Sequence, residues 1–336
     1  MNKLDPASVF NAHRDRYIKI LEPLFLPDDV TSHDIIRYFA SLLRVLGMED
    51  KGWDPYAESR NILNDLNRLM RVELPEKDFP DADKTIWRLG LLLYCHVVEM
   101  DAPYEVITNL LRFRLCKGYS PSPFFDSLTD KEKKNFAKTG IRTGRKIEII
   151  KELSKQSGLG IGEIFDEFYS NKLRNAVQHS DFIVTDEGFR CRSGSGAKAF
   201  MLSFEELDVL ITKAKAFIAA FLQIETTARQ VWGMQKGRAI PYDITYKGLM
   251  EILVDDRDLL CGFAVYWPNN SRSLYRRTKD GVEMVNCMID LANATIDLFV
   301  DRYARVPGKF SPLVEHDASP VYKPLDKSET RPTWPL

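Results

Sequence analysis

The sequence predicts a mainly α-helical fold, and three observations support this prediction. Apolar residues recur at three- and four-residue spacing through most of residues 1–120, which is the spacing of an amphipathic helix. Prolines and glycines fall between these apolar runs, where helix ends are expected. Two stretches, 181–192 and 259–281, instead combine short strand-like runs with the turn residues of a β-hairpin.

The expected helices follow one another along the chain. They cover residues 7–25, 32–47, 57–72, 83–100, 102–115, a basic stretch over 130–156, about 161–179, 204 to about 232, 246–256 and 282–306. Ser203 and Glu206 form a capping-box pattern ahead of the helix that begins at residue 204. After Arg305 the chain carries six prolines, so we expect an extended or mobile arm.

These elements predict four consecutive regions. They are a helical N-terminal region (1–80), a helical bundle (81–233), a small α/β C-terminal region (234–305) and a proline-rich tail (306–336). We expect the main boundary near residues 233–243, where glycine, proline and polar residues cluster.

Composition favours a cytoplasmic protein without a cofactor, a metal or a membrane segment. The net charge is −1, so any polyanion site must come from local clustering of basic residues. Five cysteines without a CxxC pair indicate reduced thiols, and the N-terminus lacks the apolar segment of a signal peptide. The most apolar run, 86–100, is too short for a membrane span and contains Arg88 and His96.

The stretch "NKLRNAVQHSDFIV" (171–184) carries the candidate catalytic residues Arg174, Asn175 and His179. On one continuous helix, Asn175 lies one turn before His179, at the edge of the apolar stripe, and can orient its ring. Arg174 points about 140° away from His179 on the same helix. This split suggests that two copies of the chain pool these side chains in one cleft.

These residue types suit cleavage of RNA by its own 2′-hydroxyl. Histidine can exchange a proton near neutral pH, and arginine offers a planar fork of donors to phosphate oxygens. Asn175 would orient either His179 or the phosphate. Such donors stabilise the charge that develops on the phosphorane, and the chemistry requires no metal. The alternative is a helical scaffold in which His179 is an ordinary residue at the edge of the core and the motif only ends a helix.

The wider stretch "FYSNKLRNAVQHSDFIV" (168–184) resembles the signature of the HEPN superfamily, the higher eukaryote and prokaryote nucleotide-binding domains. That signature is an arginine, a polar residue that is often asparagine, three further residues and a histidine, at the end of a helix. Arg174, Asn175 and His179 match it position by position. The resemblance covers roughly residues 85–232 and implies a HEPN-like helical bundle.

The resemblance also implies an activity. Many HEPN proteins are metal-independent endoribonucleases of toxin–antitoxin, abortive-infection and other antiviral systems, with the active site at a homodimer interface. We therefore expect a homodimer that cuts RNA, with an antitoxin or regulatory protein as a possible partner. Other members keep the fold but bind nucleotide, RNA or a partner protein without cutting, and this is the alternative expectation.

Two basic clusters are expected to contact the RNA backbone. Nine basic residues between 131 and 155 include Lys138, Arg142, Arg145 and Lys146, and the second hairpin contributes Arg276 and Arg277. The alternatives are a solvated helix face for the first cluster and an ordinary hairpin tip for the second.

Overall fold

The computed structural model describes residues 6–27, 35–46, 54–194, 196–243, 248–267, 270–290, 295–298, 303–306 and 309–312. The chain divides into two compact units, each built from separate segments. The first unit comprises Met1–Phe25, Pro55–Leu115 and Ser122–Ile224, and the second comprises Leu26–Asp54, Cys116–Pro121 and Glu225–Leu336. This division differs from the four consecutive regions expected, because the N-terminal region contributes to both units.

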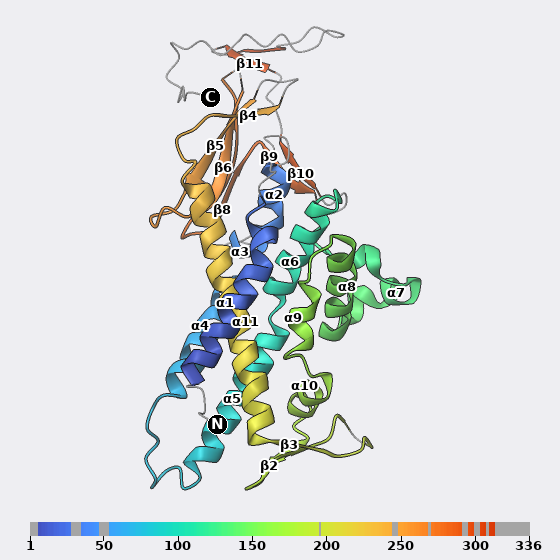
Figure 1. Ribbon diagram of the computed structural model, residues 1–336. Helices are drawn as coiled ribbons and strands as arrows, with labels where there is room; N and C mark the ends of the chain where they lie inside the picture. The colour runs from blue at the N-terminus through green and yellow to red at the C-terminus, as the bar shows by residue number, and fades with distance from the viewer. Residues whose placement is uncertain are drawn as a thin grey trace. The chain divides into compact units, whose positions relative to one another are not determined.

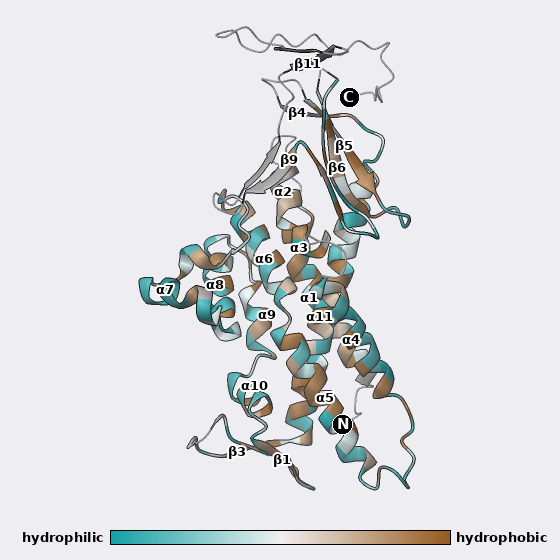
Figure 2. Ribbon diagram, turned by 180° about the vertical axis from the view of Figure 1, so that it is seen from behind, coloured by the Kyte–Doolittle hydropathy of each residue, from teal (hydrophilic) through white to brown (hydrophobic). Residues whose placement is uncertain are grey.

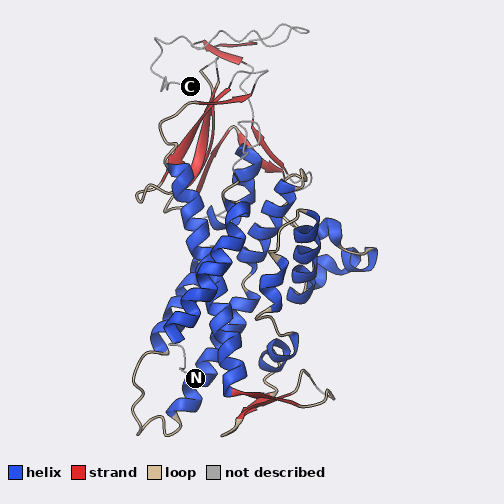
Figure 3. Ribbon diagram, viewed as in Figure 1, coloured by secondary structure: helices blue, strands red, loops and turns tan. Residues whose placement is uncertain are grey.

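The expectation of a mainly α fold is wrong. Antiparallel sheets occur in both units: a three-stranded sheet in the first, and a five-stranded sheet with two two-stranded pairs in the second (Figure 3). The protein is therefore a mixed α and β protein. A helical N-terminal region, by contrast, agrees with the expectation.

Helices make up most of the first unit (Figure 1). They are α1 (Pro6–Phe25), α4 (Pro55–Leu69), α5 (Ala82–Glu99), α6 (Asp101–Arg114), the short 3-10 helix η1 (Phe125–Ser127), α7 (Asp130–Thr139), α8 (Thr143–Gln156), α9 (Gly162–Asp166), α10 (Asn171–Gln178) and α11 (Phe204–Gly233), of which residues up to Ile224 belong here.

The core of the first unit is rich in aromatic rings. Phe217 on α11 packs against Phe165 and Phe168, with ring centroids 5.2 Å apart in both pairs. All three side chains are fully buried. Figure 2 shows the contrast between α5, which is mostly hydrophobic, and α7, which is mostly hydrophilic. Nowhere in the described ranges is a helix both long and apolar enough to cross a bilayer.

A small sheet follows the motif in the first unit. Its strands β1 (Phe182–Val184), β2 (Gly188–Cys191) and β3 (Phe200–Ser203) are antiparallel in that order, which confirms the hairpin and adds a third strand. The capping box at the start of α11 is also confirmed. Glu206 accepts from the Ser203 backbone N–H at 2.8 Å, and the Ser203 hydroxyl accepts from the Glu206 N–H at 3.1 Å.

The helix expected over 161–179 is broken in two. Helix α9 ends at Asp166 and α10 begins at Asn171. Between them the Tyr94 hydroxyl donates to the Phe168 carbonyl and accepts from the Ser170 N–H, both at 2.9 Å. Those two backbone groups therefore bond to a side chain from α5 instead of continuing a helix. The Ser170 side chain then caps α10.

The second unit contains α2 (Ile35–Ser41), α3 (Leu43–Leu46), the last residues of α11 and the larger sheet. In the larger sheet, neighbouring strands are also consecutive in the sequence. They are β4 (Ile240–Asp243), β5 (Gly248–Val254), β6 (Leu260–Tyr266), β7 (Arg272–Arg277) and β8 (Val282–Val285). Two further pairs join β9 (Cys287–Asp290) to β10 (Thr295–Leu298) and β11 (Tyr303–Val306) to β12 (Lys309–Pro312).

The second hairpin is confirmed as β6 and β7, but both expected C-terminal helices are wrong. Residues 246–256 contain β5, and 282–306 contain β8 to β11. In β5, buried Gly248, Met250 and Ile252 alternate with less buried neighbours, which is the two-residue period of a strand. Strand β12 lies in the expected proline-rich tail, whose residues 313–336 fall outside the described ranges.

Candidate active-site pocket

The motif helix ends at His179 in a defined turn. His179 is the C-cap residue of α10, and Ser180 follows in the left-handed conformation with φ +53°. The Ser180 N–H bonds to the Val177 carbonyl at 3.0 Å, and the Asp181 N–H bonds to the Ala176 carbonyl at 2.8 Å. This is the Schellman pattern, which fixes where the backbone presents His179.

The three motif side chains line one pocket of a single chain. Its volume is about 770 Å³, and all of its residues belong to the first unit. They are Arg142, Thr143, Gly144, Arg145, Ile147, Glu148, Lys151, Asp166, Tyr169, Asn171, Arg174, Asn175 and His179. Arg174 and His179 therefore line one pocket without a second chain, although they lie on different sides of the helix. The angle of about 140° still applies within α10, and the long arginine side chain spans it.

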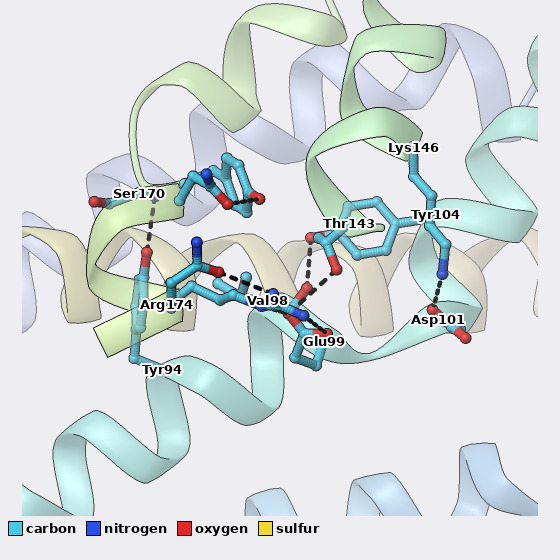
Figure 4. A network of polar contacts seen from close by, with 12 residues as sticks. Tyr94, Val98, Glu99, Asp101, Tyr104, Thr143, Lys146, Ser170 and Arg174 are labelled. Atoms are coloured by element: carbon cyan, nitrogen blue, oxygen red, sulfur yellow. Dashed lines mark hydrogen bonds and ion pairs between the residues drawn. The ribbon is translucent and has the colours of Figure 1, made fainter. Parts of the chain in front are cut away.

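Glu99, the last residue of α5, holds Arg174 (Figure 4). Its carboxylate accepts from Nε of Arg174 at 2.5 Å and from Nη2 at 2.9 Å. The Thr143 hydroxyl donates to the same carboxylate at 3.2 Å. The Arg174 and Glu99 side chains are only 23% and 30% exposed, so solvent screens this pair less than a surface pair.

The pair leaves part of the Arg174 guanidinium available. Its hydrogen bonds with Glu99 raise the Arg174 pKa, so the side chain stays cationic. A third N–H, on Nη1, donates to the Asn175 side-chain oxygen at 3.0 Å. Arginine has five N–H groups, so two have no partner among the described residues and can bind an anion in the pocket.

Asn175 does not orient His179 as the sequence suggested. Its side-chain oxygen accepts from Arg174, and its backbone carbonyl accepts from the His179 N–H at 3.0 Å. The His179 side chain is exposed and lines the pocket. Among the residues that the structure describes, its ring has no hydrogen-bonding partner. Asn175 therefore positions the arginine instead.

Tyr169 and Gly144 form a close contact in the pocket wall. A side chain at Gly144 would place its Cβ 3.1 Å from the Tyr169 hydroxyl oxygen. That hydroxyl donates to the Asn171 side-chain oxygen at 3.3 Å. Burial raises the Tyr169 pKa, so the phenol stays protonated near neutral pH. The absence of a side chain at Gly144 thus keeps α8 and Tyr169 close together.

The first basic cluster contributes two of its four named residues to the pocket. Arg142, the N-cap residue of α8, and Arg145, in its first turn, line the wall. Arg142 is exposed and has no acidic partner among the described residues. Lys138 is exposed on α7 but does not line the pocket. Lys146 is buried and pairs with Asp101, which leaves it unsuited to bind RNA.

The second basic cluster belongs to the second unit. Arg276 pairs with Glu283 at 2.9 Å, and Arg277 pairs with Asp54 at 3.2 Å. Both arginines lie on β7, and the structure does not place them in the wall of the pocket.

Sequence reasoning missed three residues that build the site: Tyr94, Glu99 and Thr143. None lies in the motif, and no local pattern links any of them to Arg174. One signal was present, because Glu99 follows two valines in the most apolar helix, and an acid at such a position requires a partner.

Across the described ranges, no group of three or more His, Cys, Asp or Glu side chains is placed to hold a metal ion. Comparison of the chain with family models, with curated proteins and with solved structures gives no match. The HEPN resemblance therefore rests on the residues of the motif alone.

Proposed function

We propose that the first unit is an endoribonuclease of HEPN type that cuts RNA by attack of a 2′-hydroxyl, without a metal ion. One observation carries the proposal: Arg174 and His179 line the same open pocket of a single chain. Arg142 adds an exposed cation to that wall. A phosphodiester held there meets both a group for proton transfer and cationic donors.

In the proposed reaction, His179 accepts the proton of the 2′-hydroxyl. The 2′-oxygen then bonds to phosphorus, and the bond from phosphorus to the 5′-oxygen breaks. The leaving 5′-oxygen takes a proton from solvent, which reaches the open pocket. Arg174 stabilises the charge on the phosphorane through its two available N–H groups, while Glu99 and Asn175 keep its guanidinium in place.

One observation favours the alternative, a module that binds nucleotide or RNA without cutting it. The His179 ring is exposed and has no orienting partner among the described residues, whereas catalytic histidines are usually held by a further hydrogen bond. In this alternative Arg174 binds a phosphate and His179 only borders the pocket. In that case neither the wild type nor any variant would cut RNA.

The test compares four purified proteins on total RNA in the presence of EDTA. They are the wild type, Arg174→Ala, His179→Ala and the control Lys172→Ala, which removes an exposed cation from α10 outside the pocket wall. We expect cleavage by the wild type and the control, and a loss of about 100-fold or more in the other two. Equal cleavage by His179→Ala, or intact RNA with the wild type, would refute the ribonuclease proposal.

The resemblance supports a biological setting for this activity. We propose a cytoplasmic homodimer that acts as a toxin or an antiviral effector, held in check by an antitoxin or another regulatory protein. Expression of the wild type should then arrest growth, and expression of His179→Ala should not. Equal growth of both cultures would contradict this setting without bearing on the chemistry.

A further inference from the structure

A second hollow adjoins the pocket at the start of α8. Its volume is about 450 Å³, and it shares the side chains of Arg142 and Arg145 with the first pocket. Its lining residues are Leu128, Lys131, Glu132, Asn135, Thr139, Gly140, Ile141, Arg142 and Arg145. The two hollows therefore meet at these two arginines.

The walls of this second hollow combine apolar and polar groups. Leu128 is buried and Ile141 half-buried, and they supply apolar surface. Lys131, Asn135 and Thr139 lie four residues apart, so they share one face of α7. Among the described residues, neither the Asn135 amide nor the Lys131 ammonium has a hydrogen-bonding partner. Free donors above apolar surface suit a planar ligand with polar edges.

Arg145 forms a fixed partition between the two hollows. Its guanidinium donates to Glu132 and Glu148, both at 3.1 Å, and to the Ser127 carbonyl at 2.9 Å. Glu132 also completes the capping box of α7 with Thr129, so the partition is tied to both helices. An arginine plane held in this way offers a surface on which a nucleobase can stack.

We infer that the second hollow binds a purine base of a nucleotide next to the scissile phosphate. This inference rests on the proposed ribonuclease function, because it places the phosphate at Arg174 and His179. Arg142, which lines both hollows, would contact the connecting backbone. The hollow thereby gives the enzyme its preference for certain cleavage sites.

The side chains around the second hollow select purines over pyrimidines. An asparagine amide pairs bidentately with N6 and N7 of adenine, and a lysine contacts N7 and O6 of guanine. Asn135 and Lys131 therefore both read the edge that carries N7, which pyrimidines lack. A bidentate contact of this kind between a side chain and a base favours the matching base about tenfold or more.

Binding of uncleavable dinucleotides tests this inference independently of catalysis. The probes are dinucleoside monophosphates with 2′-deoxyribose on the 5′ side, in a set that varies each base in turn. The proteins are the wild type, Asn135→Ala, His179→Ala and the control Lys134→Ala, an exposed neighbour on α7 outside both hollows. The measurement is the Kd from a titration followed by NMR, with melting temperatures to check folding.

We expect the wild type to bind a purine at one of the two positions about tenfold more tightly than a pyrimidine. His179→Ala and Lys134→Ala should keep this preference, and Asn135→Ala should lose most of it while still binding the phosphate. Equal affinity for all bases, or an unchanged preference in Asn135→Ala, would overturn the inference. RNA cleavage without base preference refutes the purine site alone, and purine binding without cleavage refutes the ribonuclease alone.

Discussion

Glu99 accepts two hydrogen bonds from the Arg174 guanidinium, although the two residues lie 75 positions apart in the sequence. The ion pair ties the end of α5 to the middle of α10, and these helices also contact each other directly. It therefore fixes the side chain that we place at the scissile phosphate. Glu99 is a positioning residue in this account, since it does not line the pocket.

Glu99→Gln should impair catalysis more than folding. The amide has one acceptor oxygen and no charge, so Arg174 loses one of its two hydrogen bonds to residue 99 and can swing away from the phosphate. We expect kcat to fall about 10- to 100-fold, since small misplacements of catalytic groups cost rate on this scale. Kinetics with a defined RNA should place the loss in kcat, with KM within about threefold of the wild type.

Thr143→Val is the matched control for that experiment. It keeps the shape of a buried side chain and removes the weaker contact to Glu99, at 3.2 Å, without touching the ion pair. We expect kcat to fall by about threefold or less, because this contact is long and both hydrogen bonds between Glu99 and Arg174 stay in place. A larger loss for Thr143→Val than for Glu99→Gln would show that the ion pair does not position Arg174.

Tyr94→Phe should lower stability. The lost hydroxyl bonds to Phe168 and Ser170, and two backbone groups would then lack a partner. We expect a cost of about 1–3 kcal/mol in the free energy of unfolding, the range for unsatisfied buried polar groups. Urea denaturation measures this cost. An unchanged midpoint would mean that Tyr94 does not hold the break between α9 and α10.

Glu167, in the same break, makes stability dependent on pH. Its carboxylate accepts from Arg16 and from the Tyr17 hydroxyl on α1, with Lys213 at 3.6 Å and His13 at 4.0 Å. Burial raises the Glu167 pKa, but the hydrogen bonds from Arg16 and Tyr17 and the nearby positive charges outweigh it. The pKa therefore lies below its ordinary value of 4.5.

The sign of the effect follows from that lowered pKa. A carboxyl with a lower pKa in the folded state contributes stability above its unfolded pKa of 4.5, and loses it as pH falls through the folded value. The melting temperature of Glu167→Gln should therefore lie a few degrees below that of the wild type near neutral pH. The two melting temperatures should converge below pH 4.5. A difference between the two melting temperatures that does not change with pH would show that the Glu167 carboxylate is not the source of the pH dependence.

Mixing two inactive variants tests whether one chain carries a complete site. Arg174 and His179 of the same chain line one pocket, so Arg174→Ala mixed with His179→Ala should stay inactive. A dimer whose cleft draws the arginine from one protomer and the histidine from the other would regain activity on mixing. The measurement is RNA cleavage after the variants are denatured and refolded together, with co-refolded wild type as the reference.

Much of the helical half of the fold could be predicted from sequence. Long runs with helical spacing and a capping box located α5 and α11 within a few residues. Strand β5 and the strands after β7 could not be predicted, because a short apolar run such as 248–254 fits a strand or a buried helix equally well. Only pairing with β4 and β6 decides between them, and that pairing is not local.

The candidate site was predicted only in part, for the same reason. Arg174, Asn175 and His179 were found because they are close in sequence and match a motif. The start of their helix depends on Tyr94, which bonds to the backbone in the break before α10, and the direction of the arginine depends on Glu99. Both come from α5, so a helical wheel drawn on the motif could not include them.

The most direct test of the central claim uses one RNA oligonucleotide with a mapped cleavage site, with and without the 2′-hydroxyl at that site. The wild type in EDTA should cut the first RNA, leave a 2′,3′-cyclic phosphate on the 5′ fragment, and leave the 2′-deoxy RNA intact. His179→Ala should cut neither. Equal cutting of the two RNAs by the wild type would contradict the account.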